Sequence, residues 1–288
     1  MDDVLKHWGL SKVTITELHK SAHNSTWDVG GKYVLKHNPD TKQLDHAIYL
    51  ANRLLSEGVP LAAYIKTLNG EYTTPDGAYC LMEKLKGAHV VFYDNPRAIQ
   101  ELGRGLARLH AALSNIEPEI QCNDSNLLDD WYSWIKPKLV DVNDEVIEQT
   151  EARLNDLYKQ LPRQLIHRDV HSHNVLFDNG VISGWLDFDL NQVNIRIFDL
   201  AYLLAGLLIG KTGTSTDVES WKTLYRDLLM GYNKINKLTD VEVEMLPVMM
   251  TAIELLFVAH WNINNNDREA KQAAALAEFL YNEVWIYG

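Results

Sequence analysis

Three polar residues in the second half of the sequence have the types and the spacing that phosphoryl transfer needs. Asp169 precedes Asn174 by five positions, and Asp187 follows Asn174 by thirteen. A hydroxyl nucleophile needs a neighbouring carboxylate that orients it and accepts its proton, which Asp169 can supply. A triphosphate needs a divalent metal, and Mg²⁺ prefers hard oxygen ligands such as the Asn174 amide and the Asp187 carboxylate. The pattern predicts a reaction centre at these three residues that uses ATP and Mg²⁺.

The surrounding segment resembles the catalytic loop of a known family. With Asp169 and Asn174 it reads H-x-D-x-x-x-x-N, as in the aminoglycoside phosphotransferase and choline kinase family of small-molecule kinases. Asp187 resembles the family's metal aspartate, and Asp199 resembles an aspartate that opens the next helix. The resemblance is specific over residues 165–202. It implies that Asp169 is the catalytic base, that Asn174 and Asp187 hold Mg²⁺, and that Asp199 braces the loop through hydrogen bonds.

The same resemblance implies an ATP-dependent phosphotransferase that moves the γ-phosphate to a hydroxyl of a small molecule, such as an aminoglycoside or choline. Asp199 follows Asp187 by only twelve positions, whereas protein kinases use a much longer activation segment there. Two alternatives stay open: a protein kinase, and a non-catalytic nucleotide-binding regulatory module. A zinc hydrolase using His167, His171 and His173 is disfavoured, because acidic ligands suit Mg²⁺ better.

A nucleotide site is predicted in the first ninety residues. Val34 and Lys36 lie two positions apart on one expected strand, so both face the same side. Val34 would lie under an adenine and Lys36 would contact the α- and β-phosphates, as in kinases. Ser21, Asn24 and Ser25 in the preceding polar loop are expected to cover the phosphates with donor groups.

Two further features of this nucleotide site follow from the resemblance. An acidic partner of Lys36 is expected on the helix after its strand, and Asp45 is the candidate there. The segment 79–85 resembles the strand that leads into the hinge, so the adenine is expected to bond to backbone groups near Glu83 and Leu85.

The acceptor pocket is expected in the later, helical part of the chain. His171, Asp189 and Trp261 are the candidate substrate-binding residues. Acidic and aromatic groups would suit a cationic acceptor, although tryptophans at helical spacing are more often core residues. The wider set of candidates is Asp129, Asp130, Trp131, Glu254, His260 and Asn264.

The periodicity predicts an α+β architecture with two lobes, similar to the protein-kinase fold. Alternating strands and the Gly30-Gly31 turn predict a small antiparallel β-sheet lobe over residues 1–86, with a hinge near 83–87. Residues 87–288 read as a larger, mainly helical lobe that carries the catalytic loop and the acceptor site. Within it a hairpin is predicted at Asn179-Gly180. The expected helices cover 41–57, 96–114, 128–140, 143–160, 198–208, 218–236, 239–261 and 268–286.

Composition narrows the class of protein. The chain has 288 residues with a net charge of −12, which argues against nucleic-acid and anionic-membrane partners. Its two cysteines make no disulfide framework, and the first residues show no secretory signal, so a cytoplasmic location is expected. The longest uncharged apolar run, residues 200–210, is too short to span a bilayer. The oligomeric state is not readable from the sequence.

Overall fold

The computed structural model describes residues 1–20, 24–116, 126–210 and 215–285. The chain folds into two compact units. The first consists of Met1–Val90 together with His173–Asp189, and the second of Val91–Ser172 together with Leu190–Gly288. The first unit therefore includes a segment that follows the predicted catalytic base in sequence.

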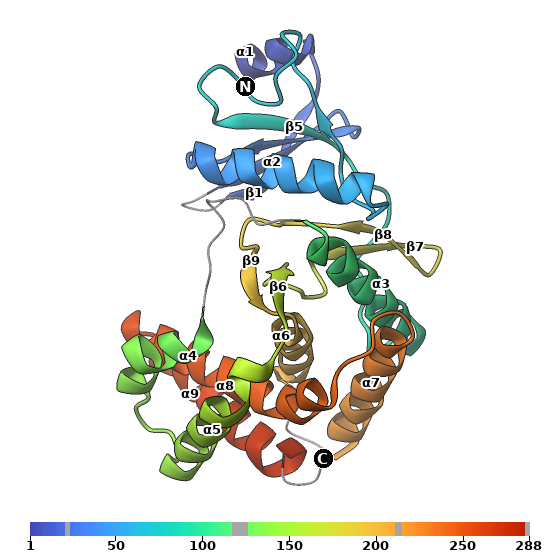
Figure 1. The fold of residues 1–288 in the computed structure, drawn as a ribbon. Helices are drawn as coiled ribbons and strands as arrows, with labels where there is room; N and C mark the ends of the chain where they lie inside the picture. Colours follow the sequence, from blue (N-terminus) through green and yellow to red (C-terminus); the bar gives the residue numbers. More distant parts are fainter. Residues whose placement is uncertain (21–23, 117–125, 211–214, 286–288) are drawn as a thin grey trace. The chain divides into compact units, whose positions relative to one another are not determined.

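The first unit is built on an antiparallel sheet of five strands in the order β1-β2-β3-β5-β4 (Figure 1). Its strands are β1 (Ile15–Lys20), β2 (Ser25–Val29), β3 (Tyr33–His37), β4 (Tyr64–Ile65) and β5 (Tyr79–Glu83). Gly30 and Gly31 both have positive φ in the turn between β2 and β3, which glycine adopts without a steric penalty. Lys36 pairs in register with Cys80, which places β3 in the middle of the sheet.

Helices cover both faces of this sheet. The N-terminal helices α1 (Asp2–Leu5) and η1 (Lys6–Trp8) bury Leu5 and Trp8 against Leu35 and Leu81 on one face. Helix α2 (Thr41–Ser56) packs its apolar side against Cys80 on the other. The Asp40 side chain caps α2 by accepting a hydrogen bond from the Gln43 N–H. Lys36 and Cys80 thus share the α2 side of the sheet.

A hairpin from later in the chain completes the first unit. Strands β7 (Val175–Asp178) and β8 (Val181–Trp185) pair in antiparallel fashion. Asn179 and Gly180 turn the hairpin with positive φ values of 51° and 81°, which confirms the turn predicted there. Backbone hydrogen bonds between Ala88 and Phe177 join the hairpin to the end of the N-terminal segment.

The second unit is mainly helical. Its helices are α3 (Pro96–Ser114), α4 (Leu127–Asp130), η2 (Trp131–Ile135), η3 (Lys136–Lys138), α5 (Asp144–Leu157), η4 (Tyr158–Gln160), α6 (Ile197–Leu208), α7 (Ser215–Asn233), α8 (Asp240–Ile263), α9 (Asp267–Leu280) and η5 (Tyr281–Trp285). A two-stranded antiparallel sheet of β6 (Arg163–Ile166) and β9 (Gln192–Ile195) lies among them. Strand β6 leads into the predicted catalytic loop and β9 leads into α6.

Helices α3 and α7 lie side by side (Figure 1) and approach each other closely at two glycines. A Cβ atom on Gly103 of α3 would lie 2.1 Å from the backbone oxygen of Leu228 on α7. In the reciprocal position, a Cβ on Gly231 of α7 would lie 2.2 Å from the backbone oxygen of Gln100 on α3. Only glycine fits at either point, so this crossing is fixed by backbone-to-backbone packing.

The predicted α+β class is confirmed, with an antiparallel sheet in the N-terminal part and helices in the C-terminal part. The prediction of domains at 1–86 and 87–288 stays a prediction. Within the described residues, every helix is too short or too polar to cross a membrane.

Candidate active site

Asp199, near the start of α6, holds the loop after β6 in place. The Asp199 carboxylate is fully buried and accepts hydrogen bonds from the backbone N–H groups of His167 (3.0 Å) and Arg168 (2.7 Å). Arg168 has a φ of +70°, a conformation that costs free energy for a non-glycine residue and that these bonds hold in place. His167 is buried, and its Nδ1 accepts the Asp169 N–H at 3.3 Å. The predicted bracing role of Asp199 is confirmed.

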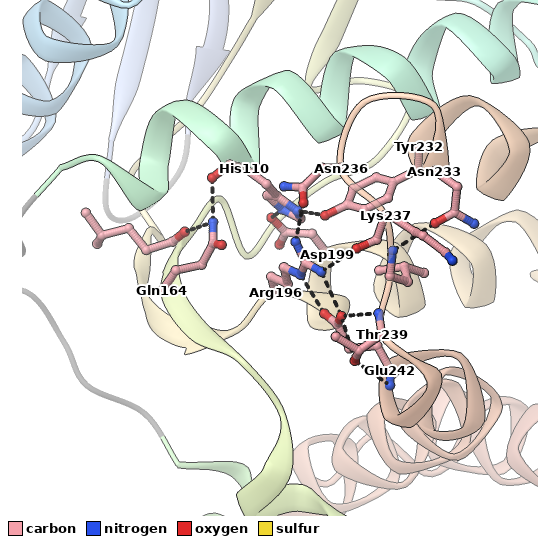
Figure 2. A network of polar contacts seen from close by, with 12 residues as sticks. His110, Gln164, Arg196, Asp199, Tyr232, Asn233, Asn236, Lys237, Thr239 and Glu242 are labelled. Atoms are coloured by element: carbon pink, nitrogen blue, oxygen red, sulfur yellow. Dashed lines mark hydrogen bonds and ion pairs between the residues drawn. The ribbon is translucent and has the colours of Figure 1, made fainter.

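A polar network continues behind Asp199 (Figure 2). His110 on α3 lies between the Asp199 carboxylate and the Tyr232 hydroxyl, at 3.0 Å and 2.8 Å. Close by, Arg196 donates two hydrogen bonds to the buried Glu242 carboxylate at the start of α8. Buried charges are tolerated when they are paired and bonded in this way. The network ties the catalytic loop to α3, α7 and α8.

Asp169 itself is held by two side chains of the second unit. The Tyr202 hydroxyl donates to its Oδ1 at 2.9 Å, and His171 Nε2 lies 3.4 Å from its Oδ2. Burial raises the pKa of Asp169, but the contacts with His171 and Tyr202 outweigh burial and leave that pKa below its usual value. Asp169 is therefore ionised at neutral pH, as a proton acceptor must be. Sequence reasoning missed Tyr202. It follows Asp199 by three positions, and this spacing places both residues on the same face of α6.

In the first unit, the hairpin brings Asn174 and Asp187 to its open end. Asn174 directly precedes β7, Asp187 follows shortly after β8, and the Leu186 N–H donates to the Asn174 backbone oxygen at 2.9 Å. Asp187 has a φ of +56°. Such a backbone is uncommon outside glycine and asparagine, and it is typical of functional sites. The two predicted metal ligands thus flank one hairpin.

Lys36 lies in the same unit and is paired with two carboxylates. Its buried Nζ is 2.6 Å from Asp189 Oδ1 and 3.8 Å from Asp187 Oδ1. The prediction that Asp45 is its acidic partner is not what the structure gives: Asp45 is exposed on α2, and Asp189 takes that place. Gln43, missed by sequence reasoning, donates from α2 to the Asp189 backbone oxygen at 3.0 Å.

The donor set around Lys36 fits a hard divalent cation. Asn174 offers an amide oxygen and Asp187 an exposed carboxylate. The Asp189 Oδ2 atom is buried and accepts no hydrogen bond from the described residues. Oxygen donors of this kind suit Mg²⁺ or Ca²⁺. The described parts of the chain contain no group of three His, Cys, Asp or Glu side chains arranged for a metal, as a zinc site built on the loop histidines would need.

The predicted adenine-binding residues lie on the adjacent strands β3 and β5 and just after β5. Val34 is half-buried and pairs in register with Met82, next to Glu83 at the end of β5. Leu85 packs so closely on Gly184 that a Cβ at that glycine would lie 2.3 Å from its side chain. Among the described residues, none accepts a hydrogen bond from the Leu85 N–H, so this donor is available for an adenine ring nitrogen.

The polar loop before β2 is only partly described. Asn24 and Ser25 lie at the start of β2, with Ser25 buried, whereas Ser21 lies outside the described residues.

The three predicted acceptor residues belong to different elements of the two units. His171 contacts Asp169 in the second unit, whereas Asp189 is bound to Lys36 in the first. Trp261 on α8 is half-buried and packs with Val258 against α9, which makes it partly a core residue.

Comparisons with known proteins identify the family of the chain. The family model described as "APH: Phosphotransferase enzyme family" matches residues 14–235. A homoserine kinase from Polaromonas naphthalenivorans (strain CJ2) is 26% identical over 238 residues, covering 77% of this chain and 72% of the relative.

Solved structures show the fold. The structure "Amicoumacin kinase hAmiN in complex with AMP-PNP, Ca2+ and Ami" matches with a TM-score of 0.72 at 19% identity, covering 96% of this chain and 90% of that one. Macrolide 2'-phosphotransferase MphH from Brachybacterium faecium matches with a TM-score of 0.67 at 15% identity, covering 96% of each chain. The fold is therefore protein-kinase-like, as predicted. Because the family model spans most of its length, the chain belongs to the phosphotransferase enzyme family and is a kinase that phosphorylates a hydroxyl group of a small molecule.

Proposed function

We propose that this kinase transfers the γ-phosphate of ATP to the side-chain hydroxyl of a small amino alcohol, with homoserine as the first acceptor to test. The observation that carries the proposal is the ionised Asp169 carboxylate, held by Tyr202 and His171 in a loop that Asp199 fixes. The relative named homoserine kinase supports the choice of acceptor.

In the proposed reaction, Asp169 orients the acceptor hydroxyl and takes its proton. A bond forms between the hydroxyl oxygen and the γ-phosphorus as the bond from that phosphorus to the ADP oxygen breaks. Because its pKa is lowered, Asp169 stays ionised over the whole neutral range, so its carboxylate can accept a hydrogen bond from the acceptor hydroxyl and orient it.

Asn174 and Asp187 are proposed to hold Mg²⁺, with the Asp189 Oδ2 atom as a further oxygen nearby. When bound, the metal neutralises charge on the phosphate oxygens. Lys36 is proposed to bind the α- and β-phosphates, exchanging its longer contact with Asp187 for the nucleotide while Asp189 keeps its ammonium in position. Val34 and the Leu85 N–H are proposed to bind the adenine. The enzyme is proposed to be cytoplasmic, where ATP is available.

The Asp169→Asn substitution tests the central role. It keeps the shape of the side chain but removes the base, so we expect turnover with ATP, Mg²⁺ and homoserine to fall by about 10²–10⁴-fold. Binding of a non-hydrolysable ATP analogue should be unchanged within about twofold. Phosphohomoserine formation is followed by ³¹P NMR and ADP release by a coupled assay.

Matched controls separate this function from its alternatives. The exposed Asp45→Asn variant removes one carboxylate from the surface of α2 and should keep full turnover. Full activity in the Asp169→Asn variant would overturn the assigned base. ATP binding with no transfer to homoserine, choline, kanamycin or a protein acceptor would favour the regulatory module instead.

A further inference from the structure

One buried carboxylate in the second unit has no counter-charge among the described residues. Glu254 on α8 is 5% exposed, and no hydrogen bond or ion pair reaches its side chain from that part of the chain. Burial alone raises its pKa to about 8. Glutamate is almost never buried without a partner, because an uncompensated carboxylate loses its hydration and gains nothing in exchange. By contrast, the other buried glutamate of α8, Glu242, is bonded to Arg196.

Glu254 acts electrostatically on Tyr202, the residue that contacts the proposed catalytic base. Its charge acts on Tyr202, whose pKa is raised chiefly by burial, then by Asp169, and in part by Glu254. Tyr202 in turn donates its hydroxyl proton to Asp169 at 2.9 Å. Tyr202 thus links the catalytic loop to the side of α8 that carries Glu254 and Phe257.

Aromatic rings extend the same face of α8. Phe257 follows Glu254 by three positions and Trp261 by seven, which places all three on one side of the helix. The Phe257 ring lies 6.1 Å from the Tyr202 ring, between centroids, and both Phe257 and Trp261 are partly exposed. A buried carboxylate that shares one side of a helix with two partly exposed aromatic rings is an environment that a cationic amine prefers, through ionic and cation–π attraction.

We propose that Glu254 binds the ammonium group of the acceptor, so that the enzyme selects small alcohols that also carry a protonated amine. This inference rests on the proposed function for the location of the acceptor hydroxyl. A bound ammonium supplies a counter-charge for Glu254, and it holds the substrate at one end while Asp169 engages the hydroxyl at the other. The electrostatic attraction within such a pair is stronger than it would be in water, because Glu254 is buried.

The Glu254→Gln variant tests the site with two acceptors that differ only in the amine. L-Homoserine and 4-hydroxybutyrate share the chain, the carboxylate and the terminal hydroxyl. For the wild type, we expect kcat/KM to be at least about tenfold higher for homoserine. In the variant, KM for homoserine should rise by roughly 10- to 1000-fold while the values for 4-hydroxybutyrate stay unchanged, so that the discrimination collapses.

A second variant controls for charge and folding. Glu244→Gln removes one negative charge from a half-exposed position on the same helix and should leave both acceptors unaffected. A merely structural role for Glu254 would lower turnover of both acceptors alike, and that result would overturn the inference. So would unchanged discrimination in Glu254→Gln.

The outcome stays separable from that of the proposed function. If the wild type phosphorylates neither acceptor, the homoserine proposal fails, and calorimetric binding of homoserine and of ethanolamine then tests Glu254 directly. Wild-type protein should bind both amines at least about tenfold more tightly than Glu254→Gln does. Equal affinity in the two proteins would contradict the amine site.

Discussion

At the scale of single residues, the carboxylate that holds Lys36 comes from a segment 153 positions further along the chain. In the structure Asp189 bonds to Lys36 through Oδ1, while its buried Oδ2 accepts no hydrogen bond from the described residues. Asp189 therefore holds the lysine in its buried position before any nucleotide is present. Asp45, which lies on the helix after the lysine strand, makes no such contact because its side chain points to solvent.

The Asp189→Asn substitution should weaken nucleotide binding, because Lys36 loses its strongest ionic contact and its ammonium is no longer fixed. We expect KM for ATP to rise by roughly 5- to 50-fold, in line with the loss of one buried charge-assisted hydrogen bond. Steady-state kinetics and calorimetry with an ATP analogue measure the effect, and Asp45→Asn is the matched control. If Asp189→Asn kept a normal KM for ATP and Asp45→Asn raised it, Asp45 would be the acidic partner of Lys36 after all.

The chemistry of the site could be predicted from the sequence where it depends on spacing along the chain. Asn174 and Asp187 flank one hairpin, so their local arrangement follows from the motif, whereas the approach of Asp169 to them stays a prediction. Contacts between distant segments could not be predicted in this way. The bond from Tyr202 to Asp169 and the pairing of Lys36 with Asp189 depend on how separate elements pack.

At the scale of elements, periodic segments were predicted well and polar ones were missed. Helix α3 begins and ends where the Asn95-Pro96 cap and the apolar spacing place it. Strand β9 was not expected, because two of its four residues are the polar Gln192 and Asn194. Both are buried, and Asn194 offers its side-chain oxygen to the Tyr158 hydroxyl and to the Ile195 N–H. The segment Gln-Val-Asn-Ile alternates polar and apolar residues over only four positions, the shortest run that indicates a strand, and asparagine is depleted in strands.

The Gly103→Ala substitution should destabilise the packing of α3 on α7. The added methyl group would overlap the Leu228 backbone oxygen, which cannot move away as a flexible side chain could. We expect a loss of about 1–3 kcal/mol in the free energy of unfolding, measured by urea denaturation. Gly206→Ala on α6 is the matched control, because its Cβ meets nothing within 4 Å; there alanine should be neutral or stabilising by up to about 1 kcal/mol. Equal effects of both substitutions would show that the close approach is unimportant.

At the scale of the whole molecule, Glu254 should make stability depend on pH. Its pKa rises from an ordinary 4.5 to about 8 in the folded state. Between these two values the folded protein binds more protons at this site than the unfolded chain does, so its contribution to stability falls as pH rises. The loss begins near pH 4.5 and is complete above about pH 8. Between these limits it grows by about 1.4 kcal/mol for each pH unit.

Glu254→Gln removes this dependence, since glutamine has no proton to lose. Relative to the wild type, the variant should gain stability progressively from about pH 4.5 to about pH 8, the range in which the wild-type carboxyl group is ionised in the unfolded chain and protonated in the folded protein. Thermal unfolding in a series of buffers without acceptor measures the difference. Glu244→Gln, at a half-exposed position of the same helix, should show no such trend. A constant difference between Glu254→Gln and the wild type across this range would contradict the raised pKa.

The first unit is formed from two separate segments of the chain, residues 1–90 and residues 173–189. This arrangement has a consequence for biosynthesis. When the lysine strand leaves the ribosome, the two aspartates that neutralise it have not yet been translated. At ordinary elongation speeds, roughly 8–30 s pass before they emerge. During that interval the nascent sheet carries an ammonium without its carboxylates, so the nucleotide-binding half can reach its final form only after much of the helical half has been made.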